Sequence, residues 1–327
     1  MIEKAPISFR PNLKSVIWGG LRLCRYKGLP DSGEKIGESW EVSAVPGRES
    51  VVAEGAYAGM TLGQLAESFG EELLGRNVVE RHGRVFPILV KLIDAADNLS
   101  VQVHPDDTLA MRRNGTPGKT EMWYIIDSEP GAHIYSGFKR PITPSEYERR
   151  VADNTFPEIL ANYHVRKGDV FFLPAGRVHS IGAGVLLAEI QQSSDITYRI
   201  YDYDRRDTAG NLRELHTALA EEAINFSDTS PETDPTHPAE ARGLEEIASC
   251  GHFTVSRLVI DAPTPIRFDP GSFTILMCVD GSATLTYPGG TTDLHRGHSL
   301  LLPAILDTIE LNGKATILTA RYPSSAT

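Results

Sequence analysis

The sequence predicts a mainly β protein in which two β-barrels are surrounded by a few peripheral helices. The run 85–93 is apolar at nearly every position, which is typical of a strand covered on both faces. Residues 167–175 and 296–304 repeat one pattern: a basic residue, a glycine turn, an apolar strand and Pro-Ala. This internal repeat favours two barrels of related design. Helical patterns are sparser, so we expect the helices to pack outside the β core.

The first predicted elements lie in the N-terminal third of the chain. A helix is expected at 61–67, because Thr61 stands at its capping position. The strand in the run 85–93 should begin at Ile88, since Pro87 has no N–H to donate to a strand ladder.

Two further helices are expected before a domain boundary. Thr143 and Glu146 have the spacing of a capping box, with proline at the first helical position. Residues 215–226 are rich in Ala, Glu and Leu, whereas the polar, proline-rich stretch after them has almost nothing to bury. The sequence therefore predicts a domain at 1–226, a linker at 227–240 and a second domain at 241–327.

Composition excludes several classes of function. The chain has 327 residues and a formal net charge of -11, which disfavours nucleic acid as a partner because phosphate binding requires a basic surface. The N-terminus lacks the apolar core of a signal peptide, and no apolar run approaches the roughly 20 residues needed to cross a bilayer. Cys24, Cys250 and Cys278 form no CxxC pair. We therefore expect a cytoplasmic protein without membrane contact.

Four side chains in the first barrel form a candidate metal site. His104 and His179 offer imidazole nitrogens, Glu121 a carboxylate oxygen and Gln102 an amide oxygen. Gln102 and His104 are two residues apart, so on one strand both side chains point to the same face. This mixed N/O set suits Zn²⁺ with positions left for water or substrate. The chain has no HExxH motif and no cysteine cluster, which makes other kinds of metal site a worse fit.

The second copy of the repeat lacks these ligand types. Continuing the same register places Thr308 opposite His179, and residues 274–281 contain no His or Glu. We expect the second barrel to be structural.

Several motifs together resemble one enzyme family. They are Trp18-Gly19-Gly20, the 37–43 segment GESWEVS, Gln102-Val103-His104-Pro105, the 118–124 segment GKTEMWY, the 174–180 segment PAGRVHS and the 189–199 segment EIQQSSDITYR. They resemble the zinc-dependent type I mannose-6-phosphate isomerases of the cupin superfamily, in their short bacterial form. The resemblance implies two cupin-like jelly rolls. It also implies that His104, Glu121 and His179 bind zinc, that Gln102 is a possible fourth ligand, and that Arg199 is the active-site arginine.

The implied reaction interconverts mannose 6-phosphate and fructose 6-phosphate by moving a proton between C2 and C1 through a cis-enediol. A metal can polarise the substrate oxygens while a cation offsets developing negative charge. Arg199 suits either that role or phosphate binding. Lys119 should share the strand face of Glu121 and enter the same pocket. The proton-transferring base is open: a metal-bound water, Glu41 and Glu189 are each chemically adequate.

Two alternatives belong to other functional classes. A cupin oxidoreductase would use Fe²⁺, and His104, Glu121 and His179 alone satisfy a site of two histidines and one carboxylate. The Gln102 position and the 194–199 segment argue against it. A non-catalytic sugar-binding module would hold its metal in a closed structural site.

Overall fold

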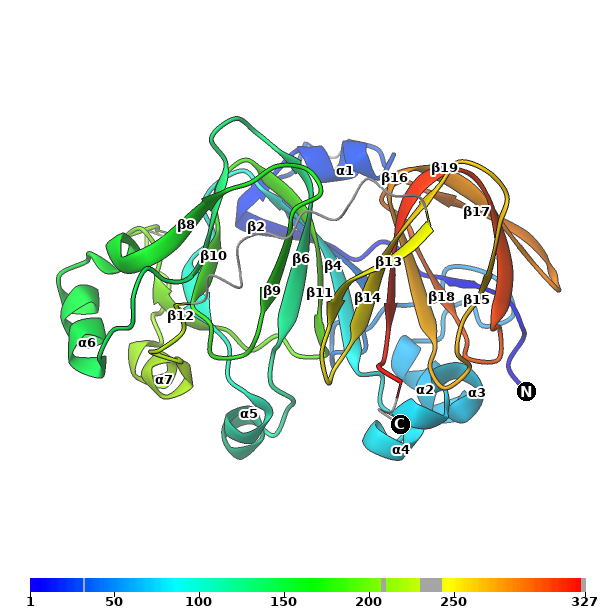
Figure 1. Ribbon diagram of the computed structural model, residues 1–327, viewed down its shortest axis with the longest axis horizontal. Helices are drawn as coiled ribbons and strands as arrows, with labels where there is room; N and C mark the ends of the chain where they lie inside the picture. The colour runs from blue at the N-terminus through cyan, green and yellow to red at the C-terminus, as the bar shows by residue number, and fades with distance from the viewer. Residues whose placement is uncertain (32, 207–209, 230–242, 325–327) are drawn as a thin grey trace.

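The structure, a computed structural model, describes residues 1–31, 33–206, 210–229 and 243–324. Two β units lie side by side along the long axis of the molecule (Figure 1). The predicted fold class is confirmed: the protein is mainly β and has the jelly-roll cupin architecture. The sheets do not close into hydrogen-bonded barrels, so each unit is better described as a sandwich of facing strands.

The first unit consists of two facing sheets. The larger contains, in spatial order, β2 (Leu13–Gly20), β3 (Ile36–Val42), β4 (Ile88–Ala95), β11 (Val185–Gln192), β6 (Glu121–Ser128) and β9 (Val170–Leu173). The smaller contains β12 (Tyr198–Tyr201), β5 (Val101–Val103), β10 (His179–Ile181), β7 (His133–Phe138) and β8 (Leu160–His164). Strand β4 begins at Ile88 as predicted, and all its residues are buried because both faces of the larger sheet are covered.

The second unit is one continuous sheet folded around its own core. Its strands are β1 (Ile7–Ser8), β18 (Ser299–Leu302), β16 (Thr274–Tyr287), β19 (Thr308–Arg321), β14 (Thr254–Ile260) and β13 (Gly243–Ser249), with β17 (Gly290–His295) beside β16 and β15 (Thr264–Arg267) beside β19. The long strands β16 and β19 pair along most of their length, with a bulge between Cys278 and Asp280. Because β1 pairs with β18, the chain begins in the second unit before it builds the first (Figure 1).

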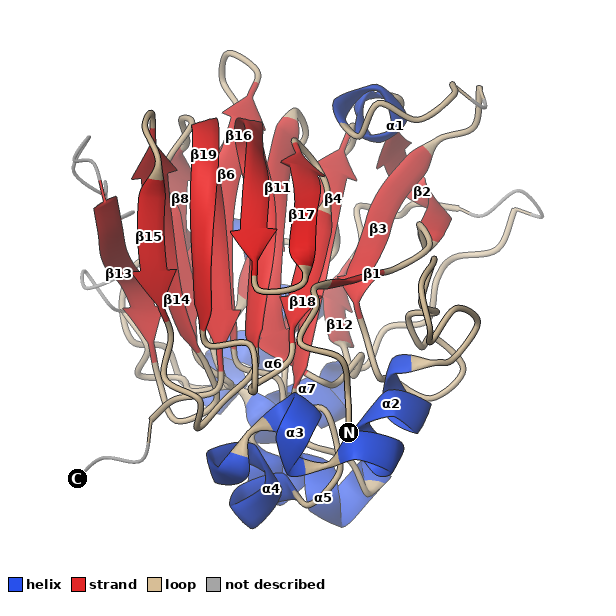
Figure 2. Cartoon of the chain, turned by 90° about the vertical axis from the view of Figure 1, so that its right-hand side faces the viewer, coloured by secondary structure: helices blue, strands red, loops and turns tan. Residues whose placement is uncertain are grey.

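The helices lie outside the sheets, as expected, and most gather at one end of the molecule (Figure 2). They are α1 (Arg22–Tyr26), α2 (Leu62–Phe69), α3 (Glu71–Leu74), α4 (Arg76–His82), α5 (Asp107–Asn114), α6 (Pro144–Ala152), the 3₁₀ turn η1 (Phe156–Ile159) and α7 (Thr217–Ala223). Phe273 N–H donates to Leu74 O at 3.0 Å, which ties α3 to the second unit. None of the helices described is long and apolar enough to cross a membrane.

Two predicted helix starts, those marked by Thr61 and Thr143, are confirmed, with one difference in capping. Thr61 and Gln64 form a complete capping box at α2. At α6, Thr143 accepts a hydrogen bond from Glu146 N–H at 3.1 Å, but the Glu146 carboxylate pairs with Arg140 instead of reaching back. Only half of the predicted capping box therefore forms.

The helix predicted at 215–226 is shorter than expected, covering Thr217–Ala223. Both flanks bond to neighbouring segments instead of continuing the helix: His216 N–H donates to Arg199 O at 2.7 Å, and Asn225 N–H donates to Gly176 O at 2.9 Å. Residues 230–240 of the predicted linker lie outside the described residues, so the domain limits remain a prediction.

The sequence repeat corresponds to equivalent strands of the two units. Strand β9 pairs with β6 so that Leu173 faces Glu121, and β18 pairs with β16 so that Leu302 faces Thr274. Leu173 and Leu302 occupy the same place in the repeat, so Thr274 stands where the first unit has Glu121.

Candidate metal centre

The three predicted ligands converge between the two sheets of the first unit. His104 directly follows β5 and His179 begins β10, whereas Glu121 begins β6 of the facing sheet. Their ligand atoms lie within 4.8 Å of one another. His179 Nε2 lies 3.2 Å from His104 Nε2 and 3.3 Å from Glu121 Oε1, and each side chain is at most 1% exposed. No second group of this kind occurs in the described ranges.

Backbone contacts orient both imidazoles for ligation. His104 Nδ1 lies 2.8 Å from Ile196 O, and His179 Nδ1 lies 2.9 Å from Arg177 O. A carbonyl oxygen only accepts, so each Nδ1 carries the hydrogen and each Nε2 turns its lone pair toward the cluster. Burial and the nearby Lys119 ammonium lower the pKa of His179 to about 3 and hold the pKa of His104 well below its usual value. Both rings are therefore neutral, as metal ligation requires.

The Glu121 carboxylate fits a bound cation. Burial and the Glu189 carboxylate raise the pKa of Glu121 to about 7. Its Oε1 has no hydrogen-bond donor among the described residues and instead faces the lone pair of His179 Nε2. This carboxylate oxygen and the imidazole lone pair, 3.3 Å apart, repel each other unless a positive ion lies between them. The residues present thus fit a divalent metal.

The other predicted site residues lie at different distances from the ligands. Lys119 Nζ lies 2.8 Å from Glu121 Oε2 and 3.0 Å from His104 Nε2, inside the cluster. The Gln102 amide nitrogen is placed 3.3 Å from His179 Nε2. Exchanging the amide nitrogen and oxygen of Gln102 would turn an acceptor toward the cluster. The side chain is close enough for a fourth ligand, and that role remains a proposal.

Arg199 lies beside Gln102 but bonds elsewhere. The two residues are paired across β12 and β5, so their side chains share one face of the sheet. Arg199 Nη1 donates to Glu214 O at 2.8 Å. Burial lowers the pKa of Arg199, and Arg213 lowers it further while Asp202 opposes this. The guanidinium therefore belongs to a basic region next to the metal centre.

A buried ion pair missed by the sequence reasoning lies on the larger sheet. Lys91 Nζ contacts Glu189 Oε1 at 2.9 Å and Gln191 Oε1 at 2.8 Å, and Trp123 Nε1 donates to Glu189 Oε2 at 2.8 Å. Although burial alone would raise it, the Lys91 ammonium lowers the pKa of Glu189 to about 2. A lysine inside the apolar run 88–93 was the available signal, because an unpaired lysine is almost never fully buried.

Of the two carboxylates considered as bases, only Glu189 is near the cluster. Glu41 contacts Lys27 Nζ at 2.6 Å and accepts a hydrogen bond from Ser39, in the interface with the second unit. Lys27 in turn donates to the Gly297 carbonyl of that unit. Glu41 thus joins the two units and is engaged away from the metal centre.

Loss of Lys91 should destabilise the fold. In the Lys91→Met variant the buried Glu189 carboxylate loses its partner, so we expect the free energy of unfolding at pH 7 to fall by about 3–5 kcal/mol. The loss of stability in the variant should become smaller as acid protonates the unpaired carboxyl group. In the wild type, the ionised Glu189 contributes to stability above pH 4.5, and this contribution is lost as the pH falls toward 2. Urea unfolding of the chelated protein across this range measures both effects. A Lys91→Met/Glu189→Gln double variant should recover part of the loss, and equal stability of Lys91→Met and wild type at pH 7 would contradict the argument.

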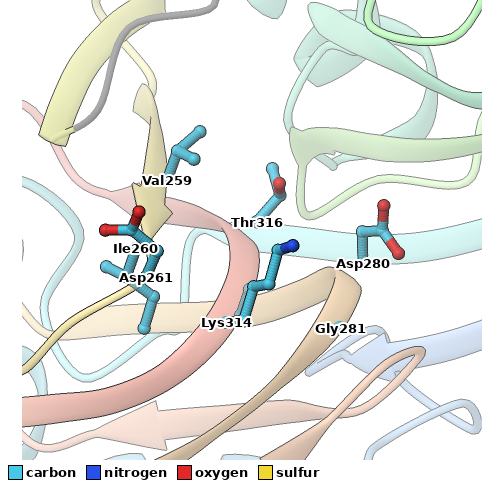
Figure 3. A pocket seen from close by; sticks show the side chains of 8 residues that line it. Val259, Ile260, Asp261, Asp280, Gly281, Lys314 and Thr316 are labelled. Carbon is cyan, nitrogen blue, oxygen red and sulfur yellow. The ribbon is translucent and has the colours of Figure 1, made fainter.

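The second unit has a cavity without such ligands. Its volume is about 290 Å³, and Figure 3 shows Lys314 between Asp261 on one side and Asp280 on the other. The lining residues are Val259, Ile260, Asp261, Asp280, Gly281, Lys314, Ala315 and Thr316. This cavity offers no imidazole nitrogen, so we assign the metal centre to the first unit.

Comparison with known proteins identifies the family. Residues 7–128 match the family described as phosphomannose isomerase type I, catalytic domain, and residues 245–321 match the mannose-6-phosphate isomerase cupin domain. The mannose-6-phosphate isomerase ManA of Bacillus subtilis is 36% identical over 313 residues, which is 95% of this chain and 96% of the relative. The chain belongs to the type I phosphomannose isomerase family. The resemblance stated from its motifs is therefore confirmed.

Other members of the phosphomannose isomerase family agree in length and fold. The mannose-6-phosphate isomerase of Streptococcus mutans is 32% identical over 96% of this chain and 97% of its own length. The crystal structure of the Bacillus subtilis mannose 6-phosphate isomerase superimposes with a TM-score of 0.83 at 32% identity, covering 96% of this chain and 99% of that one. The apo structure from Salmonella typhimurium, at 16% identity and a TM-score of 0.78, shares the fold. Membership in this family implies a metal cofactor, which the His104–Glu121–His179 cluster is built to hold.

Proposed function

We propose that the protein is an aldose–ketose isomerase that interconverts mannose 6-phosphate and fructose 6-phosphate with Zn²⁺ held by His104, Glu121 and His179. The observation that carries the proposal is the convergence of these three buried acceptors in a chain of this family. Two neutral imidazoles, a carboxylate and a nearby amide suit Zn²⁺ better than Mg²⁺ or Ca²⁺, which prefer oxygen alone. A cytoplasmic location belongs to the same proposal, supported by three free cysteines.

The bound metal would supply Lewis-acid polarisation of the substrate oxygens at C1 and C2. Lys119 is the side chain best placed to move a proton at those oxygens, because its ammonium already contacts Glu121 and His104. Glu189 is a weak base because its pKa is held near 2, so its role is to fix Lys91 and Trp123 beside the site. Both Glu189 oxygens are engaged, one by Lys91 and one by Trp123, so Glu189 is the less suitable candidate for the base that takes the carbon-bound proton.

A group of arginines in and after β12 of the smaller sheet could bind the negative charge of the substrate. Arg199, Arg205 and Arg213 gather around Asp202, which bonds to Arg205 and Arg213, and Arg205 also pairs with Asp97 at 3.6 Å. Guanidinium groups suit a phosphate dianion or the negative charge of an enediolate. Arg199, on the same sheet face as Gln102, is the member of this cluster nearest the metal ligands in the sheet register.

Removing the metal should abolish turnover. We expect the chelated protein to lose isomerase activity on mannose 6-phosphate and to recover it on addition of Zn²⁺, since the substrate oxygens are no longer polarised without a cation. A coupled assay before and after chelation, with elemental analysis of the purified protein, makes the measurement. Iron with oxygen consumption would instead support a cupin oxidoreductase, and absence of turnover in every state would support a sugar-binding module.

A further inference from the structure

We propose that Asp107 and Gln192 form a positioning clamp that sets the directions of Lys119 and Glu121 at the metal centre. Neither residue touches the cluster itself. The inference concerns the same site and rests on the proposed function only for its activity measurement. Its main measurement is the metal affinity of the protein.

Gln192 holds both polar backbone groups of Thr120. Gln192 N–H donates to Thr120 O at 3.1 Å, and Thr120 N–H donates to Gln192 Oε1 at 2.9 Å. Thr120 lies between Lys119 and Glu121, so fixing its peptide groups fixes the positions from which both side chains leave the backbone. Gln192 can do this because it ends β11, whose Gln191 is paired with Glu121.

Asp107 fixes the Gln192 amide. Asp107 Oδ1 accepts hydrogen bonds from Gln192 Nε2 and from Gly118 N–H, both at 2.8 Å. The Gln192 amide then has one satisfied orientation, in which nitrogen faces Asp107 and oxygen faces Thr120. Although partial burial opposes it, these hydrogen bonds lower the pKa of Asp107, so the acceptor is an ionised carboxylate at neutral pH.

The same segment is tied to the backbone that follows His104. Lys119 N–H donates to Pro105 O at 3.1 Å. Gly118 packs so closely that an added Cβ would lie 2.6 Å from Asp107 N and 2.8 Å from Pro105 O. Any loosening of the clamp therefore changes the spacing between Glu121 and His104.

A third bond reaches the segment before His179. Thr120 Oγ1 accepts a hydrogen bond from Ala175 N–H at 3.2 Å. Lys119 and Thr120 together thus link the backbone segments of all three ligands. Groups that bond directly to metal ligands typically change metal affinity by about 10- to 100-fold when lost, and the clamp acts on the residue that precedes the ligand Glu121.

The decisive variant is Gln192→Glu. It keeps the acceptor for Thr120 but replaces the donor to Asp107 by a second carboxylate oxygen, so the clamp becomes repulsive. We expect Zn²⁺ affinity, measured on the apo protein by competition with a chromophoric chelator, to fall about 10- to 100-fold. At saturating Zn²⁺, kcat should fall more than KM rises, because the reacting groups and not substrate binding are displaced. Gln192→Met, which lacks both side-chain bonds without adding charge, should weaken Zn²⁺ binding in the same direction.

A double variant tests the pairing itself. In Asp107→Asn/Gln192→Glu the new amide can donate to the new carboxylate while its oxygen still accepts from Gly118. We expect Zn²⁺ affinity to return to within about threefold of wild type, a coupling that independent structural damage would not give.

Asp106→Ala is the matched control. Asp106 caps α5 by accepting from Leu109 N–H at 2.8 Å, and its side chain makes no such bond to Gly118 or Gln192. This variant should melt about 2–4 °C lower and keep its Zn²⁺ affinity within about twofold. Unchanged Zn²⁺ affinity in folded Gln192→Glu and Gln192→Met, an equal loss in Asp106→Ala, or failure of the double variant to recover would each overturn the clamp. If neither the wild type nor any variant isomerises the sugar, the proposed function is wrong. The Zn²⁺ affinities would still test whether Asp107 and Gln192 position the metal centre.

Discussion

Replacing His104 by alanine should remove bound metal and isomerase turnover together, with turnover falling by about 10³-fold or more. Its Nε2 is one of three acceptors around the site, and its Nδ1 bond to Ile196 O fixes the direction of that lone pair. Without the ring, Glu121 and His179 remain as two ligands beside a void. Elemental analysis of the purified variant and an assay on mannose 6-phosphate with added Zn²⁺ measure both losses.

His164→Ala provides the control for this experiment. His164 is an exposed histidine on β8, in the same sheet as His179 but on the other side of β7. The control should keep full metal content and activity. A His104→Ala protein that retained both metal and turnover would show that the site does not use this imidazole, and the assignment of the metal centre would be wrong.

The ligands could be predicted from sequence because each is marked by local chemistry. Gln102 and His104 alternate along one strand, and His179 follows a glycine turn and an apolar strand of fixed length. The structure adds the long-range fact that β5, β6 and β10 bring these residues to one point. The strand pairings also show that Thr274 stands where the first unit has Glu121, an equivalence that the ungapped sequence repeat does not reach.

The Lys91–Glu189 pair could not be predicted from local sequence patterns. Its members are 98 residues apart and meet because the register of β4 and β11 places their Cα atoms opposite each other. A shift of one residue in that register would turn one of them to the other face of the sheet. The sequence shows a lysine in an apolar strand, but the identity of its partner depends on the pairing.

Helix boundaries, too, could be predicted from the sequence only where they depend on local contacts. The capping residue Thr61 marks where α2 begins, because the cap is a local hydrogen bond. The end of α7 is decided by the bond from Asn225 to Gly176, a contact 49 positions away in sequence that no periodicity reveals. The packing of α3 against the second unit is likewise a tertiary contact.

Replacing Arg199 by alanine should leave the metal in place and lower kcat/KM for mannose 6-phosphate by about 10²–10³-fold. The guanidinium bonds to Glu214 O and lies among Arg213 and Asp202, and it is not one of the three ligands of the cluster. The backbone of Arg199, which accepts from His216 N–H, is unchanged by the substitution. Elemental analysis and steady-state kinetics on the variant measure the two properties separately.

The choice of substrate separates the two roles open to Arg199. If the side chain binds phosphate, the variant should lose activity on mannose 6-phosphate and show no comparable loss on unphosphorylated mannose; if it stabilises the enediolate, both substrates should suffer equally. Arg206→Ala, at an exposed arginine that bonds to Gly210 O, is the control and should match wild type on both. If Arg199→Ala lost its metal, the guanidinium would be shown to support the metal ligands. A side chain that interacts only with the substrate should not change the metal content.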